Sequence, residues 1–195
     1  VFEVYSDTNG DGKLDKDDTL LGEMKELDGG VYQMSELRYG KYLVKETKAP
    51  TGFVLDENVY AVSIEENGKT YTVENKAGVG FINAAQKGSL KIVKTSSDGK
   101  VEGFSFRVTG VDYDQTFKTD KNGEIVIEGL RIGDYTVSEV SDKASAGYIL
   151  PADKQVTVKV NATAIVQMHN EFRDTPKTGD DFNLGLWVSL AALSV

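Results

Sequence analysis

Apolar and polar residues alternate along most of the chain in short runs, as expected where successive side chains point to opposite faces of a strand. Examples are Phe104–Val108, Tyr135–Val137 and Val156–Val160. Turn-forming pairs such as Asp98-Gly99 and Asn122-Gly123 lie between such runs. Apart from the C-terminal apolar stretch, no segment keeps a helical period. The pattern predicts an all-β chain of short antiparallel strands.

The chain also contains an internal repeat. Residues 30–46 align without gaps with residues 123–139, an offset of 93 residues (123 − 30), and both copies hold Leu-Arg-x-Gly-x-Tyr-x-Val-x-Glu. Each copy continues to an Ala-x-x-Gly-aromatic turn. This density of identity indicates two homologous modules, which we place at residues 1–85 and 88–172. Seven or so short strands per module are typical of an immunoglobulin-like β-sandwich.

Three apolar strand faces of the second module each end in a polar residue. The faces that begin at Leu90, Tyr135 and Val166 end in Lys94, Glu139 and Asn170. Burial of such groups costs several kcal/mol unless they are paired. One interpretation is that they lie at strand ends, where their tips reach water. The other is that they form a chemical site.

The first module repeats two of these polar residues in register. Its faces Tyr42-Val44-Glu46 and Val79-Phe81-Asn83 end in the same glutamate and asparagine. A duplicated pair is harder to explain by chance placement at strand ends, so the repeat favours the chemical interpretation.

The pattern around these residues resembles a known domain family. Lys94-x-x-x-Asp98-Gly99, the Tyr-x-Val-x-Glu139 box and the closing Asn170 resemble a collagen-adhesin B-type domain, also called SpaA-type or prealbumin-like. Such domains occur in Gram-positive pilins and adhesin stalks. The resemblance covers residues 2–83 and 88–170. It implies two tandem prealbumin-like β-sandwich domains.

The resemblance further implies an intramolecular isopeptide bond between Lys94 and Asn170, assisted by Glu139. In the first module it implies that Glu46 and Asn83 are the glutamate and asparagine of an equivalent bond. The partner lysine is expected upstream of Val1, because the N-terminus reads as a cut through a domain. This bond would form once per molecule, so we expect no enzymatic activity on other molecules.

Elementary chemistry supports that assignment. Burial disfavours charge, so it lowers the pKa of a lysine and raises that of a glutamate. A neutral amine is the nucleophile that the reaction needs, and a protonated Glu139 can polarise the Asn170 amide and carry protons. Folding holds the groups together at effective molarities of ~10⁵–10⁸ M.

A loop in the first module matches the EF-hand pattern for calcium. Oxygen donors or main-chain carbonyls fall at loop positions 1, 3, 5, 7, 9 and 12. These positions are Asp7, Asn9, Asp11, Lys13, Asp15 and Asp18. Asp18 replaces the usual glutamate and has a shorter side chain. The alternative is an acidic, solvated hairpin, since Asn-Gly and Asp-Gly form turns in any case.

The C-terminal residues resemble a sortase sorting signal. Residues 173–181 read as a linker that carries a Leu-Pro-x-Thr-Gly-type motif, with Thr175 in place of leucine. The motif consists of Thr175, Pro176, Lys177, Thr178 and Gly179. Residues 182–195 are apolar and uncharged, shorter than the ~20 residues that span a bilayer, and read as the start of a truncated membrane segment. The resemblance implies cleavage after Thr178 and attachment to peptidoglycan or a neighbouring pilin.

The amino-acid composition excludes several classes of site and partner. The chain has no cysteine and one histidine, which excludes disulfides, thiol chemistry and His-rich metal sites. A net charge of −9 argues against a nucleic-acid partner. We therefore expect an extracellular, cell-wall-anchored pilin or adhesin stalk with sortase as a partner and no cofactor except Ca²⁺. The alternative is an adhesin module that binds a host protein or glycan. An enzyme finds little support.

Overall fold

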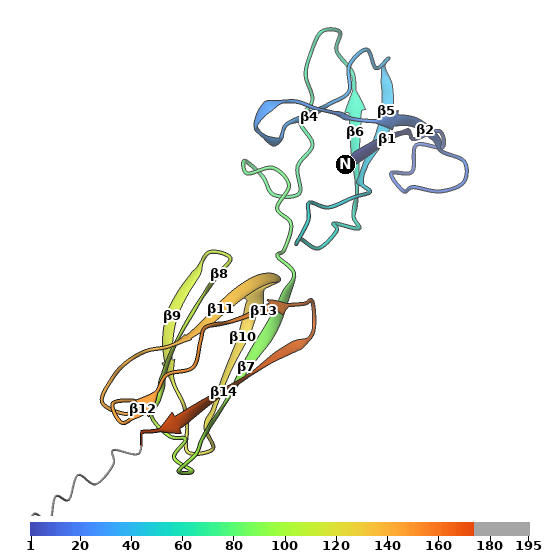
Figure 1. Ribbon diagram of the computed structural model, residues 1–195. Coiled ribbons are helices and arrows are strands. Elements are labelled where there is room, and N and C mark those ends of the chain that lie inside the picture. Colours follow the sequence, from blue (N-terminus) through green and yellow to red (C-terminus); the bar gives the residue numbers. More distant parts are fainter. Residues whose placement is uncertain (174–195) are drawn as a thin grey trace, which may run out of the picture.

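The computed structural model describes residues 1–173 and shows two all-β domains that lie end to end (Figure 1). Within those residues the only helix is a single 3₁₀ turn, η1 (Asp28–Gly30). No helix in that range is long and apolar enough to cross a membrane. The predicted sorting motif at residues 175–179 and the apolar segment at residues 182–195 lie outside the described residues. The predicted all-β class is confirmed.

The second domain is a sandwich of two four-stranded sheets. The first sheet has the order β10 (Glu124–Arg131), β7 (Lys87–Ser96), β14 (Thr163–Phe172), β12 (Tyr148–Ile149). The second has the order β13 (Lys154–Val158), β11 (Gly133–Glu139), β8 (Ser105–Gly110), β9 (Tyr113–Lys118). Inward-facing residues of both sheets, such as Ile92, Phe106, Val137 and Met168, form one continuous core. Their alternation along each strand is the two-residue period of the sequence.

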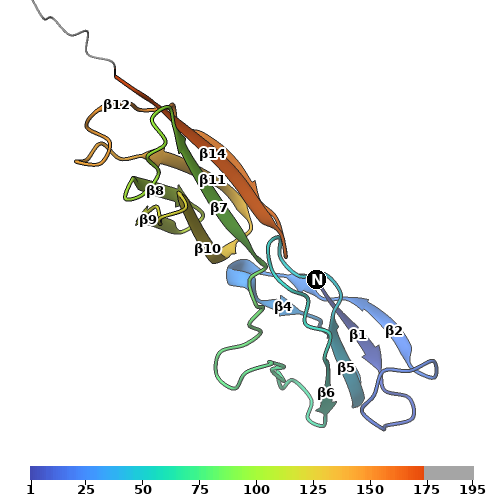
Figure 2. The ribbon, with the colours of Figure 1, turned by 90° about the horizontal axis from the view of Figure 1, so that it is seen from below.

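Strands β7 and β14 form the one parallel pair of this domain. They lie side by side in Figures 1 and 2, although most of the domain separates them in sequence. Lys94 lies opposite Met168, and Asn170 lies opposite Ser96. Side chains of residues 90, 92 and 94 on β7 and of residues 166, 168 and 170 on β14 are all buried. Both predicted faces therefore point into the core.

The first domain is built on a single four-stranded sheet. Its order is β2 (Thr19–Glu23), β1 (Phe2–Ser6), β5 (Gly40–Glu46), β6 (Val59–Ile64). A two-stranded ribbon of β3 (Lys25–Glu26) and β4 (Tyr32–Gln33) is separate from it. The core is small, with Phe2, Val4, Tyr42 and Val44 at its centre.

Strand register shows how the two domains correspond. Glu46 on β5 lies opposite Phe2 on β1, as Glu139 on β11 lies opposite Phe106 on β8. Strand β1 is thus the counterpart of β8, and within residues 1–86 no strand is the counterpart of β7.

The predicted strand face Val79-Phe81-Asn83 is wrong. These residues form no strand, and Val79 is 60% exposed. In the second domain the corresponding strand, β14, takes its ladder hydrogen bonds from β7 and β12. In the first domain the described residues supply only two isolated bridges, one between Phe53 and Ala85 and one between Lys76 and Gly80. A backbone without a strand partner satisfies its polar groups by other bonds. Here the Ile82 amide donates to Asn75 Oδ1, and Asn75 Nδ2 donates to the Ile82 carbonyl.

Candidate functional site

Three polar side chains meet inside the second domain. Lys94 comes from β7, Asn170 from the neighbouring β14, and Glu139 from the end of β11 in the opposite sheet. Their exposed fractions are 1%, 0% and 9%. The structure therefore buries all three residues that the sequence singled out, and the interpretation in which their tips reach water does not hold.

Asn170 and Glu139 are directly hydrogen-bonded. The Asn170 Nδ2 donates to Glu139 Oε1 at 2.6 Å. The other two oxygens of the pair, Glu139 Oε2 and Asn170 Oδ1, are buried and have no partner within residues 1–173. Such orphaned acceptors are costly. If the Glu139 carboxyl group carries a proton, it becomes a hydrogen-bond donor, and Asn170 Oδ1 is an acceptor that lacks a donor.

The Lys94 amine points toward the same end of the strand pair. Its Nζ donates to the Thr95 carbonyl at 2.5 Å and lies 4.3 Å from the centre of the Phe104 ring. Asn170 is one inward-facing position beyond Met168, the residue opposite Lys94. That step is about 6.6 Å along a strand, a length that an extended lysine side chain spans.

Burial controls the protonation of this site. It lowers the pKa of the Lys94 ammonium, against the opposing attraction of the Glu139 and Asp98 carboxyl groups. It also raises the pKa of the Glu139 carboxyl, although the hydrogen bond from Asn170 and the charge of Lys94 oppose that shift. Both shifts favour a neutral amine and a neutral acid over an ion pair.

The first domain repeats the glutamate–asparagine pair. Asn83 Nδ2 donates to both Glu46 oxygens, at 2.9 and 2.8 Å, and to the Val54 carbonyl at 3.1 Å. Glu46 is 2% exposed and also accepts from the Asp56 amide at 2.8 Å. Lys94 is the only buried lysine among residues 1–173, so the described part of this domain holds the pair without an amine.

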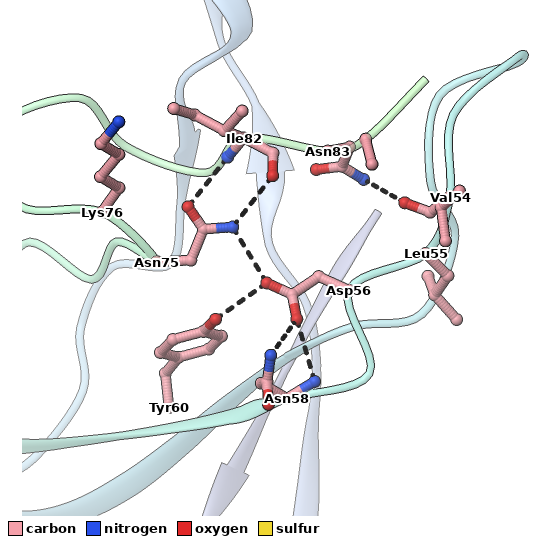
Figure 3. Close-up of a pocket in the computed structure, with 10 residues that line it drawn as sticks. Val54, Leu55, Asp56, Asn58, Tyr60, Asn75, Lys76, Ile82 and Asn83 are labelled. Atoms are coloured by element: carbon pink, nitrogen blue, oxygen red, sulfur yellow. Dashed lines mark hydrogen bonds between the residues drawn. The ribbon is translucent and has the colours of Figure 1, made fainter. Parts of the chain in front are cut away.

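Asn83 lies at the rim of a pocket beside a second polar network (Figure 3). The Asp56 carboxylate accepts from the Asn58 side chain at 2.7 Å, the Tyr60 hydroxyl at 2.8 Å and the Asn75 amide at 3.0 Å. Burial alone would raise the pKa of Asp56, but hydrogen bonds led by that from Asn75 lower it. The network is internally satisfied, so its role is to hold the segment that carries Asn83.

The acidic loop of the first domain folds around its own backbone amides. The carboxylate of Asp7, which is 7% exposed, accepts from Gly10 N at 2.7 Å and Gly12 N at 3.1 Å. Asp18 accepts from Thr8 N and Asp15 N, which ties the end of the loop to its start. Within residues 1–173, no three acidic or histidine side chains converge closely enough to form a metal cluster.

Two residues near Lys94 were not recognised from sequence as part of the site. Tyr148 and Phe104 flank the amine, and Tyr148 donates its hydroxyl hydrogen to Asp98 at 2.7 Å. The Gly-aromatic repeat contained Tyr148 as a turn residue, but nothing in the repeat shows that its ring folds back over β7. His169, on the outer face of β14, is exposed and bonds to Thr95 and Glu171.

Solved structures of similar fold include a pilus adhesin. The pilus adhesin SpaC of Lactobacillus rhamnosus GG matches over 88% of this chain and 28% of its own, with 14% identity and a TM-score of 0.54. A C-terminal fragment of SpaC matches over 88% of both chains, with 16% identity and a TM-score of 0.51. The Bacillus anthracis TIE protein is 24% identical over 88% of this chain, with a TM-score of 0.45.

The chain spans 32% of the TIE protein's length. The likeness to SpaC supports a shared fold alone. No curated protein sequence matches the chain. The family model for SpaA, described as a prealbumin-like fold domain, matches residues 1–77 and 88–172. The chain therefore belongs to the SpaA family and carries two of its prealbumin-like domains.

Proposed function

We propose that this chain is the stalk portion of a Gram-positive pilin or adhesin, in which the second domain braces itself with a Lys94–Asn170 amide bond. One observation carries the proposal: an amine, a carboxamide and a carboxyl group are buried together, with two acceptor oxygens left unpaired. Family membership and the pilus proteins among the structural neighbours support the setting.

The bond-forming step balances without a co-reactant. The neutral Lys94 Nζ attacks Asn170 Cγ, the new C–Nζ bond forms, and the C–Nδ2 bond breaks to release ammonia. In this proposal the neutral Glu139 carboxyl, which contacts Nδ2, gives its proton to the leaving nitrogen and takes one from Nζ, so it ends the reaction as it began. The reaction runs once and acts on no other molecule.

The brace suits a protein that carries load outside the cell. With no cysteine in the chain, disulfides cannot cross-link the sandwich. An amide between β7 and β14 joins the first and last strands of the domain, and no reductant opens it. We further propose that sortase attaches the chain through residues 175–179 to peptidoglycan or to another pilin subunit.

We also propose that the Asp7–Asp18 loop binds Ca²⁺. The residue types fit, because a hard cation prefers carboxylate and carbonyl oxygens. The hydrogen bonds of the loop support this, since those of Asp7 curl its first half and that from Thr8 N to Asp18 ties its end to its start. Asp11 and Asp15 supply further carboxylates within the loop.

Mass spectrometry of the intact chain tests the amide bond. The purified protein should weigh one ammonia less than its sequence, whereas the Lys94→Ala and Asn170→Ala variants should show the full mass. As a cross-link that closes a long loop, the bond should stabilise the domain by about 3–5 kcal/mol. Thermal unfolding of both variants should therefore begin at a lower temperature. A parent protein at full mass would refute the proposal.

A further inference from the structure

Tyr148 closes one side of the space that holds the Lys94 amine. Its ring centre lies 5.9 Å from Lys94 Nζ, and it packs edge-on against Phe104 and Phe172, each with ring centres 5.2 Å apart. Tyr148 is 3% exposed. The amine is thus enclosed by aromatic rings that exclude water.

The ring is carried by a very short strand. Tyr148 belongs to β12, which has two residues and pairs only with Phe172 and Glu171 at the end of β14. So short an edge strand has few ladder bonds to hold it in place. Two turn bonds support this pairing, from Tyr148 N to the Ser145 carbonyl at 3.0 Å and from Arg173 N to the Gly147 carbonyl at 2.9 Å. The direction of the ring itself is set by its side-chain contacts.

The phenol supplies such a contact. Its hydroxyl donates to Asp98 Oδ2 at 2.7 Å. The other Asp98 oxygen accepts from Ser96 Oγ at 2.8 Å and Lys100 N at 3.1 Å, which fixes Asp98 to the turn that follows β7. Burial and the bond to Asp98 raise the pKa of Tyr148 to about 12, so the hydroxyl remains a donor at neutral pH.

We propose that Tyr148, held by Asp98, is a positioning residue for the Lys94–Asn170 reaction: it keeps water from the amine and aims the amine along the strand pair. This inference rests on the proposed function. The corresponding residue of the first domain is Phe53, which is bridged to Ala85 as Tyr148 is paired with Phe172 and has no hydroxyl.

The groups that face the Lys94 amine determine how the position of the Tyr148 ring affects the pKa of Lys94. These are Glu139 from β11, Asp98 from the turn after β7, and Tyr148 from β12. Both carboxyl groups favour a charged amine, and burial alone opposes them. If the ring swings out, water enters, the pKa of Lys94 rises, and less of the amine is in its reactive neutral form.

The rate of ammonia loss tests this. The full chain is recovered unfolded from inclusion bodies, refolded by dilution over a series of pH values, and quenched at intervals for intact mass. The rate should rise with pH as Lys94 loses its proton. In Tyr148→Ala the midpoint of that rise should move up by about one pH unit.

Tyr148→Phe keeps the ring and removes only the tether, so it should fold and react about tenfold more slowly, which corresponds to roughly 1.4 kcal/mol. Tyr135→Phe is the matched control, because it also deletes a buried hydroxyl, one that donates to the Arg131 carbonyl at 2.9 Å. It should react at the parental rate.

If Tyr148→Phe reacts as fast as Tyr135→Phe, or if Tyr148→Ala keeps the parental pH midpoint, the positioning role is wrong. A parent that never loses ammonia would instead refute the proposed function itself.

Discussion

At the residue scale, the site depends on how burial changes the chemistry of three ordinary side chains. Exposed lysine and glutamate are charged at neutral pH, and an amine in that form is not a nucleophile. Inside the second domain, burial shifts the pKa values of Lys94 and Glu139 toward neutral forms. In the proposed reaction this neutral amine attacks Asn170, whose Nδ2 already donates to the Glu139 carboxyl group.

Glu139→Gln separates proton transfer from shape. Glutamine has nearly the same size and remains neutral, but it cannot take up and return a proton. Ammonia loss should slow by ~10²–10⁴-fold, the usual contribution of general acid–base catalysis. Intact mass against time after refolding measures the rate.

Glu46→Gln is the matched control for that variant. It changes the equivalent buried glutamate of the first domain, which bonds to Asn83 but has no buried lysine beside it within residues 1–173. It should leave the reaction unaltered. Parental kinetics in Glu139→Gln would show that Glu139 transfers no proton.

At the element scale, the parallel pair of β7 and β14 brings together residues that are far apart in sequence. Lys94 and Asn170 are near neighbours in space only because these two strands pair directly. Each strand alone has an ordinary alternating pattern, and the pattern predicts the inward face of each. The pairing itself comes from the topology of the sandwich, which the family resemblance implied and alternation could not provide.

The acidic loop that joins β1 to β2 is the second element with a testable role. Titration calorimetry with CaCl₂ should show heat of binding, and the thermal midpoint of the first domain should rise, because a ligand that binds only the folded state stabilises it. Asp7→Asn should abolish both effects. Asp7 occupies position 1 of the loop and is its buried carboxylate.

Asp17→Asn provides the control for charge alone. Asp17 is exposed and falls outside the predicted ligand positions, so this variant should still bind Ca²⁺. The absence of both heat and stabilisation in the parent would show that the loop is a hairpin held by its own hydrogen bonds.

At the scale of the whole molecule, the repeat in the sequence predicted the two domains, but not their difference. The second domain has two full sheets around one core, whereas the first has one full sheet within the described residues. Alternation suggested a strand at Val79–Asn83. A strand needs a neighbour for its backbone bonds, and residues 1–173 provide only the isolated bridge between Lys76 and Gly80 there.

Contacts between the domains were likewise not readable from sequence. The Gln86 amide donates to the Gly52 carbonyl at 2.8 Å, and its own carbonyl accepts from Ile132 N at 3.2 Å. The Arg131 guanidinium lies 5.3 Å from the centre of the Phe53 ring. Sequence patterns predict the turns of each domain one by one, but they do not predict that turns of the two domains contact each other.

The central claim is the covalent link between β7 and β14, and peptide mapping tests it most directly. After denaturation and trypsin digestion, tandem mass spectrometry should find the peptide containing Lys94 joined to the peptide containing Asn170, less one ammonia. Trypsin should not cut after Lys94, because its amine is blocked. Two separate peptides, with cleavage after Lys94 and an intact Asn170 amide, would contradict the account.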